Sequence, residues 1–155
     1  MKILEKTTIV STLIILLLTL AAFMPNINAA DAQTVNWDTF AYIIVSPNPV
    51  GVGQDLIVQF RIDKTVPTGS VLGPFWEGFT VKITRPDGTT ETRGPLTADS
   101  TGGSWFIYTP TIVGQYTFQT SFPGQLVTWS GGVPPGGFLP LPAFQRYYKP
   151  SHFAV

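Results

Sequence analysis

The alternation of side chains in residues 54–62 constrains the fold of this chain more than any other feature. From Leu56 to Ile62 every second residue is apolar, whereas Gln59 and Arg61 between them are polar. Successive side chains of an extended strand point to opposite faces, so this pattern buries one face and leaves the other in water. No segment after residue 32 shows a helical period of useful length. We therefore expect an all-β domain.

Five more segments have the aromatic and β-branched composition that favours strands. They cover residues 40–45, 79–84, 89–93, 104–109 and 114–120. Glycine and proline separate them, and a tight turn is expected at 85–88, because Pro86 presets φ and Gly88 tolerates a positive φ. The polar segment 89–93 is expected at a sheet edge. Short strands separated by turn signals are typical of a sandwich or a barrel.

The C-terminal part of the chain has a different composition. Residues 123–150 are rich in proline, glycine and aromatic side chains. Proline cannot donate to a strand ladder and glycine adds no packing, so we expect a long loop there. Residues 151–155 are interpreted as the start of a truncated last strand. The chain is therefore expected to be a fragment of a longer protein, or an open reading frame that ends early.

Residues 1–32 have the order of a secretory signal. Lys2 and Lys6 precede an apolar run over residues 9–23. Ala30-Asp31-Ala32 has the pattern that a signal peptidase accepts, and Asn28-Ala29-Ala30 is a second site. The run is about 15–16 residues long, short for the roughly 20 of a spanning helix, so a cleaved signal peptide is favoured over a signal anchor. Residues 33–39 are expected to be a linker. We predict a secreted or cell-surface protein, bound to the membrane only through residues 1–32 if they are not cleaved.

Charge and composition argue against several functions. Nine basic and nine acidic residues give zero net charge, and no basic cluster is present to neutralise phosphates, so nucleic-acid binding is disfavoured. The chain has no cysteine, which removes disulfides, thiolate zinc sites and cysteine nucleophiles. His152 is the only histidine and is expected to be exposed near the end of the chain. We predict no enzyme activity, no cofactor and no metal.

A calcium site formed by loop carboxylates is the alternative to a domain without a metal. Asp63, Glu77 and Asp99 fall in expected loops and carry the oxygen ligands that calcium prefers. No Asp-x-Asp or Asp-x-Asn-x-Asp spacing accompanies them. A calcium site is therefore the less favoured interpretation.

Tyr116 points to the type of sandwich. It follows Gly114 near the start of an expected strand, as in the tyrosine corner of immunoglobulin-like domains, where the hydroxyl bonds to the preceding backbone. Residues 46–54 also look like the bend between the first two strands of many prokaryotic surface domains of this type. We therefore expect an immunoglobulin-like β-sandwich over residues 40–122.

A narrower resemblance rests on five segments in a fixed order. They are residues 46–54, 76–78, 85–89, 99–103 and 113–117. Together they resemble the N-terminal immunoglobulin-like domain of exported archaeal proteins that continue into a β-propeller similar to those that bind pyrroloquinoline quinone. The resemblance covers about residues 40–150, implies a non-catalytic module, and carries over no catalytic residue. The propeller itself is absent from these 155 residues.

Aromatic residues are the candidate contacts with a ligand or partner. Trp76 and Trp129 lie in expected loops, where exposed aromatics favour recognition, and Tyr147 and Tyr148 join them as candidates. Trp105 lies within an expected strand and is expected in the core.

Three functions follow from these features. The favoured one is a module for adhesion, assembly or spacing at the cell surface, with a protein or polysaccharide as partner. In it the edge strand at residues 89–93, or one left open by the truncated last strand, pairs with a neighbour. The second is carbohydrate binding through Trp76 and Trp129. The third is an enzyme subdomain whose catalytic part lies beyond residue 155.

Overall fold

The computed structural model describes residues 33–155, so the expected signal or anchor segment, residues 1–32, lies outside the described residues. The described part is all-β, as expected, and contains no helix. Its ten strands are β1 (Val35–Trp37), β2 (Ala41–Ser46), β3 (Leu56–Ile62), β4 (Phe79–Thr84), β5 (Thr90–Leu96), β6 (Gly103–Tyr108), β7 (Thr117–Phe122), β8 (Gln125–Trp129), β9 (Phe144–Tyr148) and β10 (Ser151–Ala154). No helix within residues 33–155 has the length and apolar character needed to cross a membrane.

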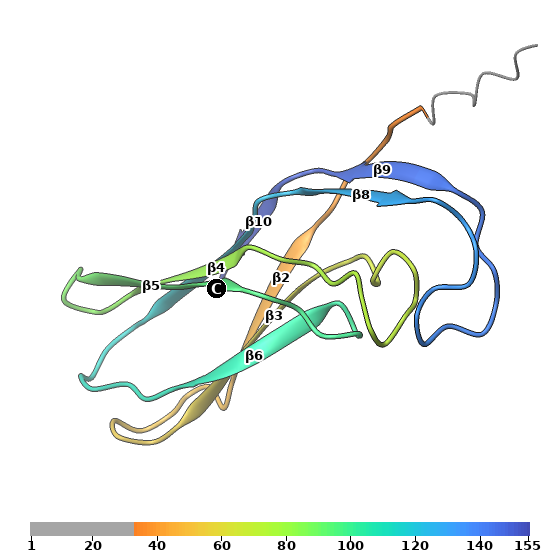
Figure 1. The fold of residues 1–155 in the computed structure, drawn as a ribbon. Helices are drawn as coiled ribbons and strands as arrows, with labels where there is room; N and C mark the ends of the chain where they lie inside the picture. The colour runs from red at the N-terminus through yellow and green to blue at the C-terminus, as the bar shows by residue number, and fades with distance from the viewer. Residues whose placement is uncertain (1–32) are drawn as a thin grey trace, which may run out of the picture. The chain divides into compact units, whose positions relative to one another are not determined.

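The strands form three sheets (Figure 1). One has the order β2-β3-β6 and another the order β10-β7-β4-β5, and all pairs within both are antiparallel. The third has the order β1-β9-β8, in which β1 runs parallel to β9. Strand β5 lies at a sheet edge, as expected from its polar sequence.

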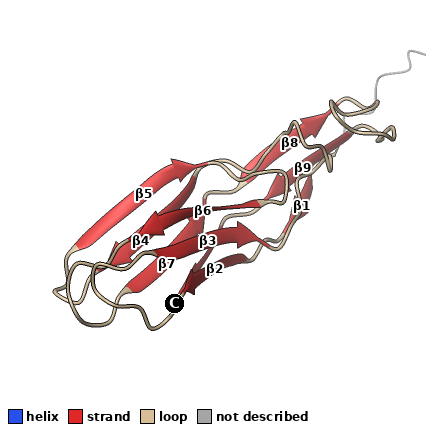
Figure 2. Ribbon diagram, turned by 90° about the horizontal axis from the view of Figure 1, so that it is seen from below, coloured by secondary structure: helices blue, strands red, loops and turns tan. Residues whose placement is uncertain are grey.

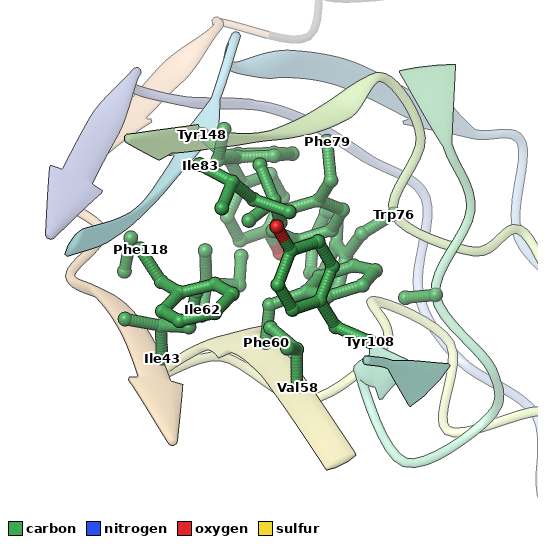
Figure 3. Packing of buried hydrophobic residues seen from close by; sticks show 14 of the residues in the cluster. Ile43, Val58, Phe60, Ile62, Trp76, Phe79, Ile83, Tyr108, Phe118 and Tyr148 are labelled. Atoms are coloured by element: carbon green, nitrogen blue, oxygen red, sulfur yellow. The ribbon is translucent and has the colours of Figure 1, made fainter. Parts of the chain in front are cut away.

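The hydrophobic core lies between the first two sheets, which gives a sandwich-like arrangement (Figure 3). Phe60 of β3 packs against Phe79 of β4 with 5.2 Å between ring centroids. The apolar residues of β3 that the alternation assigned to the core are all buried, at 4% exposure or less. Burying each such side chain is worth about 1.5–3 kcal/mol, so this face holds the two sheets together.

The tyrosine corner is present. The Tyr116 hydroxyl accepts hydrogen bonds from the backbone N–H groups of Thr111 and Ile112 and donates one to the carbonyl of Ile112, all at 3.2 Å. Gly114 has a φ of +139°, and a Cβ added there would lie 2.6 Å from Cβ of Pro86. The corner is therefore packed directly against the β4–β5 turn.

The turn at residues 85–88 also forms as expected. The backbone N–H of Gly88 donates to the carbonyl of Arg85 at 2.9 Å, and Gly88 has a φ of +82°. The N–H of Arg85 donates to the carbonyl of Thr89 at 2.8 Å, which closes the hairpin. This is a type I turn followed by a left-handed glycine, a common three-residue hairpin loop.

The expectation of a long loop over residues 123–150 was wrong. Strands β8 and β9 pair along residues 125–129 and 144–148, and a further bridge joins Gly132 to Leu141. The β8–β9 register continues that of β7 and β10, because Phe122 faces Ser151 and Gln125 faces Tyr148. One long hairpin thus extends through two sheets. The pairing is interrupted between the sheets, where Pro123 and Gly124 lie opposite Lys149 and Pro150.

We call residues 125–148 the arm and residues 133–140 its tip. The arm projects from the sandwich, as Figure 2 shows for β8 and β9. Strands β8 and β9 bond to each other along the arm. This pairing stabilises an extended conformation below the tip, although the segment is rich in proline and glycine. Residues 130–143 retain the expected loop character, apart from the Gly132–Leu141 bridge, as do the short connections at 123–124 and 149–150.

Two other expectations concern the ends of the domain. Residues 33–39 are not only a linker, because β1 lies within them and pairs with β9 from Val35 to Trp37. The partner of β1 is distant in sequence, so no local pattern indicates this strand. Residues 151–154 form strand β10, as expected from their sequence, and it pairs with β7 at four positions at the edge of its sheet.

Asp87 and Asp99 are expected to make folding sensitive to acid. The Thr89 hydroxyl donates to Asp87 at 2.6 Å, and the Thr101 hydroxyl to Asp99 at 2.6 Å. These bonds are the main reason that the pKa of both carboxyls is lowered in the folded chain. A lowered folded pKa contributes stability above the unfolded value of about 3.9, and that contribution is lost as pH falls through the folded value.

Denaturant unfolding of the wild-type chain and of the Asp87→Asn, Asp99→Asn double variant, each measured from neutral pH to about pH 3, checks this. The free energy of unfolding should fall more steeply below about pH 4 in the wild type than in the variant. Equal acid slopes in the two proteins would contradict it.

Candidate functional site

Two of the four aromatic residues predicted to contact a ligand are part of the core. Trp76 has no exposed surface, and Tyr148 is 1% exposed. Their rings lie 4.5 Å apart, and the Trp76 indole N–H donates to the carbonyl of Lys64 at 3.0 Å. The prediction that Trp76 and Tyr148 are surface contacts was therefore wrong: they join the arm to the sandwich.

The other two predicted contacts lie on the arm. Trp129 of β8 faces Phe144, and Tyr147 of β9 faces Leu126. Both Trp129 and Tyr147 are half-buried. Because Trp76 lies in the core, the structure does not bring Trp76 and Trp129 together as a platform on the surface.

Trp105 is exposed, contrary to the expectation that it lies in the core. Its side chain on β6 is 59% exposed. Residues 105–108 are all apolar or aromatic, so their sequence does not indicate which face is buried. The pairing of Trp105 with Gln59 of β3 decides it, since Gln59 lies on the outward face of the alternating strand.

Trp105 belongs to an apolar patch on the outer surface of the β2-β3-β6 sheet. We call this patch the outer face, and its apolar members are Tyr42, Ile44, Ile57, Trp105 and Ile107, each between 45% and 59% exposed. Cross-strand pairing places them in rows. Ile44 and Trp105 flank Gln59 in one row, and Ile57 pairs with Ile107 in the next.

Polar groups lie at both ends of the outer face. Asp55 accepts a hydrogen bond from the Thr109 hydroxyl at 2.5 Å beyond one end of β3. Arg61 lies near the other end of that strand and pairs with Tyr42. An apolar centre with a polar rim is the anatomy of a protein–protein interface.

Strand β6 has an open edge beside the outer face. Within residues 33–155 it pairs only with β3. Its sequence carries no charge, and unpaired backbone groups along such an edge are a template for another strand.

The β5 edge differs. Glu91 of β5 forms ion pairs with Arg85 and Arg93, and Gly94 and Pro95 follow within the same strand. Charges and proline are devices that protect an edge from pairing. The sequence-based choice of residues 89–93 as the pairing edge is therefore less favourable than β6.

The three loop carboxylates do not converge. Asp63 pairs with Lys64 and accepts a hydrogen bond from the backbone of Phe40 at 2.8 Å, while Asp99 is bonded within its own turn. Glu77 is exposed. Among the described residues, no group of three or more histidine or carboxylate side chains is arranged to hold a metal ion.

A hollow of about 510 Å³ lies beside the tyrosine corner. Its walls include Val45, Val50, Leu56 and Tyr116, and no acidic or basic side chain lines it. The Tyr116 hydroxyl is already bonded to backbone. The hollow therefore offers no group for acid–base or nucleophilic chemistry.

Comparison with known proteins does not identify a family. No family model matches the chain, and no curated protein and no solved structure matches it.

Proposed function

We propose that this chain is an exported, non-catalytic immunoglobulin-like module that makes protein contacts at the cell surface, for adhesion, assembly or spacing. The strand order supports the immunoglobulin-like assignment. One sheet holds β2, β3 and β6, the other holds β10, β7, β4 and β5, and a tyrosine corner precedes β7.

The outer face with the open β6 edge is the observation that carries the proposal. Five large apolar side chains share one face of a three-stranded sheet, although such a face is normally polar when it meets water. Exposed apolar patches of this kind mark contact sites. A partner that adds a strand to β6 satisfies its backbone groups and covers Trp105 and Ile107 in the same step.

The targeting sequence supports export, and the resemblance to archaeal domains that precede a propeller remains a prediction. The mass of the protein purified from the native membrane and medium tests both. A mature mass beginning near Asp31 or Gln33 supports export with cleavage. A product much heavier than 155 residues shows that the gene continues, and the function is then shared with the missing part.

Photocrosslinking tests the outer face. We expect a benzoylphenylalanine placed at Trp105 to crosslink to a protein partner in the native host, because Trp105 is the most exposed side chain of the outer face and lies on the open β6 edge. The matched control is the same group at Lys82, which is exposed on the other sheet. Equal crosslinking at both positions would remove the outer face as the contact site.

The Trp105→Ala variant is expected to weaken binding to the partner without unfolding the chain. Truncating a tryptophan that forms a binding hot spot typically costs at least about 2 kcal/mol of binding, or roughly 30-fold in affinity. The stability of the isolated chain should change by less than about 1 kcal/mol, since the residue is exposed. Titration with the crosslinked partner and denaturant unfolding measure the two quantities separately.

Carbohydrate binding remains the alternative, and the same variant tests it. Trp76 has no exposed surface for a sugar ring, so Trp37, Trp105 and Trp129 are the indoles available. If a polysaccharide changes the tryptophan fluorescence of the wild type but not that of Trp105→Ala, the partner of the outer face is a carbohydrate and not a protein.

A further inference from the structure

The tip of the arm exposes apolar side chains to a degree that packing within the domain does not explain. Phe138 is 97% exposed, Leu139 76% and Val133 54%. In the neighbouring loop, Val71 is 62% exposed and Leu72 is 68% exposed. A Cβ on Gly136 would lie 3.1 Å from Val71 and 3.3 Å from Leu72, so the loop and the tip form one surface.

Charged side chains are absent from this surface and from the chain around it. Residues 125–145 and 65–76 contain no lysine, arginine, aspartate or glutamate. The first charge on the arm is Arg146, and it stacks over Trp37 and Phe144 at 4.7 and 4.2 Å from their ring centroids. The arm is therefore uncharged at its tip and carries an arginine with aromatic partners further back.

Hydrogen bonds close the base of the tip. Gly132 and Leu141, which flank it, exchange two hydrogen bonds at 3.0 and 2.9 Å, and the Gly137 N–H donates to the Pro134 carbonyl at 2.8 Å. In the neighbouring loop, Ser70 donates to the Pro135 carbonyl and accepts from the Leu72 N–H. The prolines at 134, 135 and 140 have no N–H group, which lowers the cost of moving the tip out of water.

The direction of β1 relates the tip to the N-terminal sequence. Strand β9 runs from the tip toward the sandwich, and β1 is parallel to it, with Val35 opposite Arg146 and Trp37 opposite Tyr148. The chain therefore enters β1 from the side that faces the tip. Residues 24–34 separate the apolar run 9–23 from β1, and they span at most roughly 40 Å when fully extended.

We propose that the arm tip is a membrane-contact element that inserts Phe138, Leu139 and the Val71-Leu72 pair into the interface of a lipid bilayer. An apolar surface of this kind enters about 5–10 Å into the headgroup and acyl boundary. Arg146 lies further back on the arm, stacked on Trp37 of the neighbouring strand β1, where a tryptophan and an arginine suit the headgroup level. The tip has no basic residue, so a neutral bilayer suffices.

A lipid surface fits the tip better than a protein partner does. The tip is a protruding hairpin end without charged groups to orient a protein, whereas the chain enters the domain from the tip side after an apolar run suited to membrane targeting. This surface is separate from the outer face, so the inference stands or fails independently of the proposed protein contact.

The test uses the full chain reconstituted in phosphatidylcholine vesicles. The chain has no cysteine, so Phe138→Cys carries a single environment-sensitive nitrobenzoxadiazole label. Val113→Cys is the matched control, because Val113 is 88% exposed on the β6–β7 loop, at the end away from the arm. Both positions are exposed, so the labels leave the fold intact, as an unfolding curve can verify.

We expect the label at 138 to shift its emission to the blue and to be quenched by lipids that carry a spin label. The label at 113 should keep its emission in water. A water-like emission of the label at 138 in these vesicles, which contain no host protein, or equal shifts at both positions, would overturn the proposal. Protection of the label at 138 only when host proteins are added would assign the tip to a protein partner instead.

Discussion

Replacing Trp76 with alanine is expected to destabilise the domain by about 3–5 kcal/mol, the usual cost of removing a buried aromatic side chain. Trp76 has no exposed surface and contacts the rings of Phe122 and Tyr148. Its loss also leaves the Lys64 carbonyl without the indole donor. The free energy of unfolding of a small domain is about 5–15 kcal/mol, so the substitution removes a large share of it. Denaturant unfolding followed by circular dichroism measures it.

Trp105→Ala is the matched control, because the chemical change is the same and only the burial differs. We expect it to cost less than about 1 kcal/mol, since Trp105 is 59% exposed. Comparable losses in the two variants would mean that Trp76 does not hold the arm to the sandwich. A large loss for Trp105→Ala alone would contradict the assignment of the outer face to the surface.

The Gly114→Ala variant is expected to lose about 2–6 kcal/mol of stability through two effects. The φ of +139° at Gly114 is one that L-residues rarely adopt, and holding an alanine there costs about 1–3 kcal/mol. The new methyl group would also lie 2.6 Å from Pro86 Cβ, and forced overpacking costs about 1–3 kcal/mol more. Thermal and denaturant unfolding both report the loss.

Gly88→Ala separates the two effects. Gly88 has a φ of +82°, but no atom lies within 4 Å of an added Cβ. That variant bears only the cost of the left-handed conformation, about 1–2 kcal/mol. A smaller loss at Gly114 than at Gly88 would show that the corner and the β4–β5 turn do not pack against each other.

Local patterns allowed the strands of the sandwich and two of its turns to be predicted. The alternation in β3 identified its buried face correctly, because a period of two assigns side chains to faces without reference to any partner. Tyr116 and Gly88 were also placed correctly, since a tyrosine corner and a tight turn involve residues close in sequence.

The candidate sites could not be predicted in the same way. Trp76 and Trp105 were assigned opposite environments to those they have, because an indole fits both a core and a surface. The expected loop placed Trp76 outside, although the arm returns over it and covers it at Tyr148. A partly charged or polar pattern in β6 would have indicated its outward side, but residues 105–108 are apolar or aromatic throughout.

The sequence by itself determined that residues 33–155 are all-β, which face of β3 is buried, and where the chain turns after β4. Only the tertiary structure decided that β8 and β9 extend the β7–β10 hairpin, that β1 joins β9, and that Trp105 rather than Trp76 faces solvent. The physical reason is that strand pairing and burial depend on residues far apart in sequence. Val35 and Arg146, or Gln59 and Trp105, acquire their roles only when the folded chain brings them together.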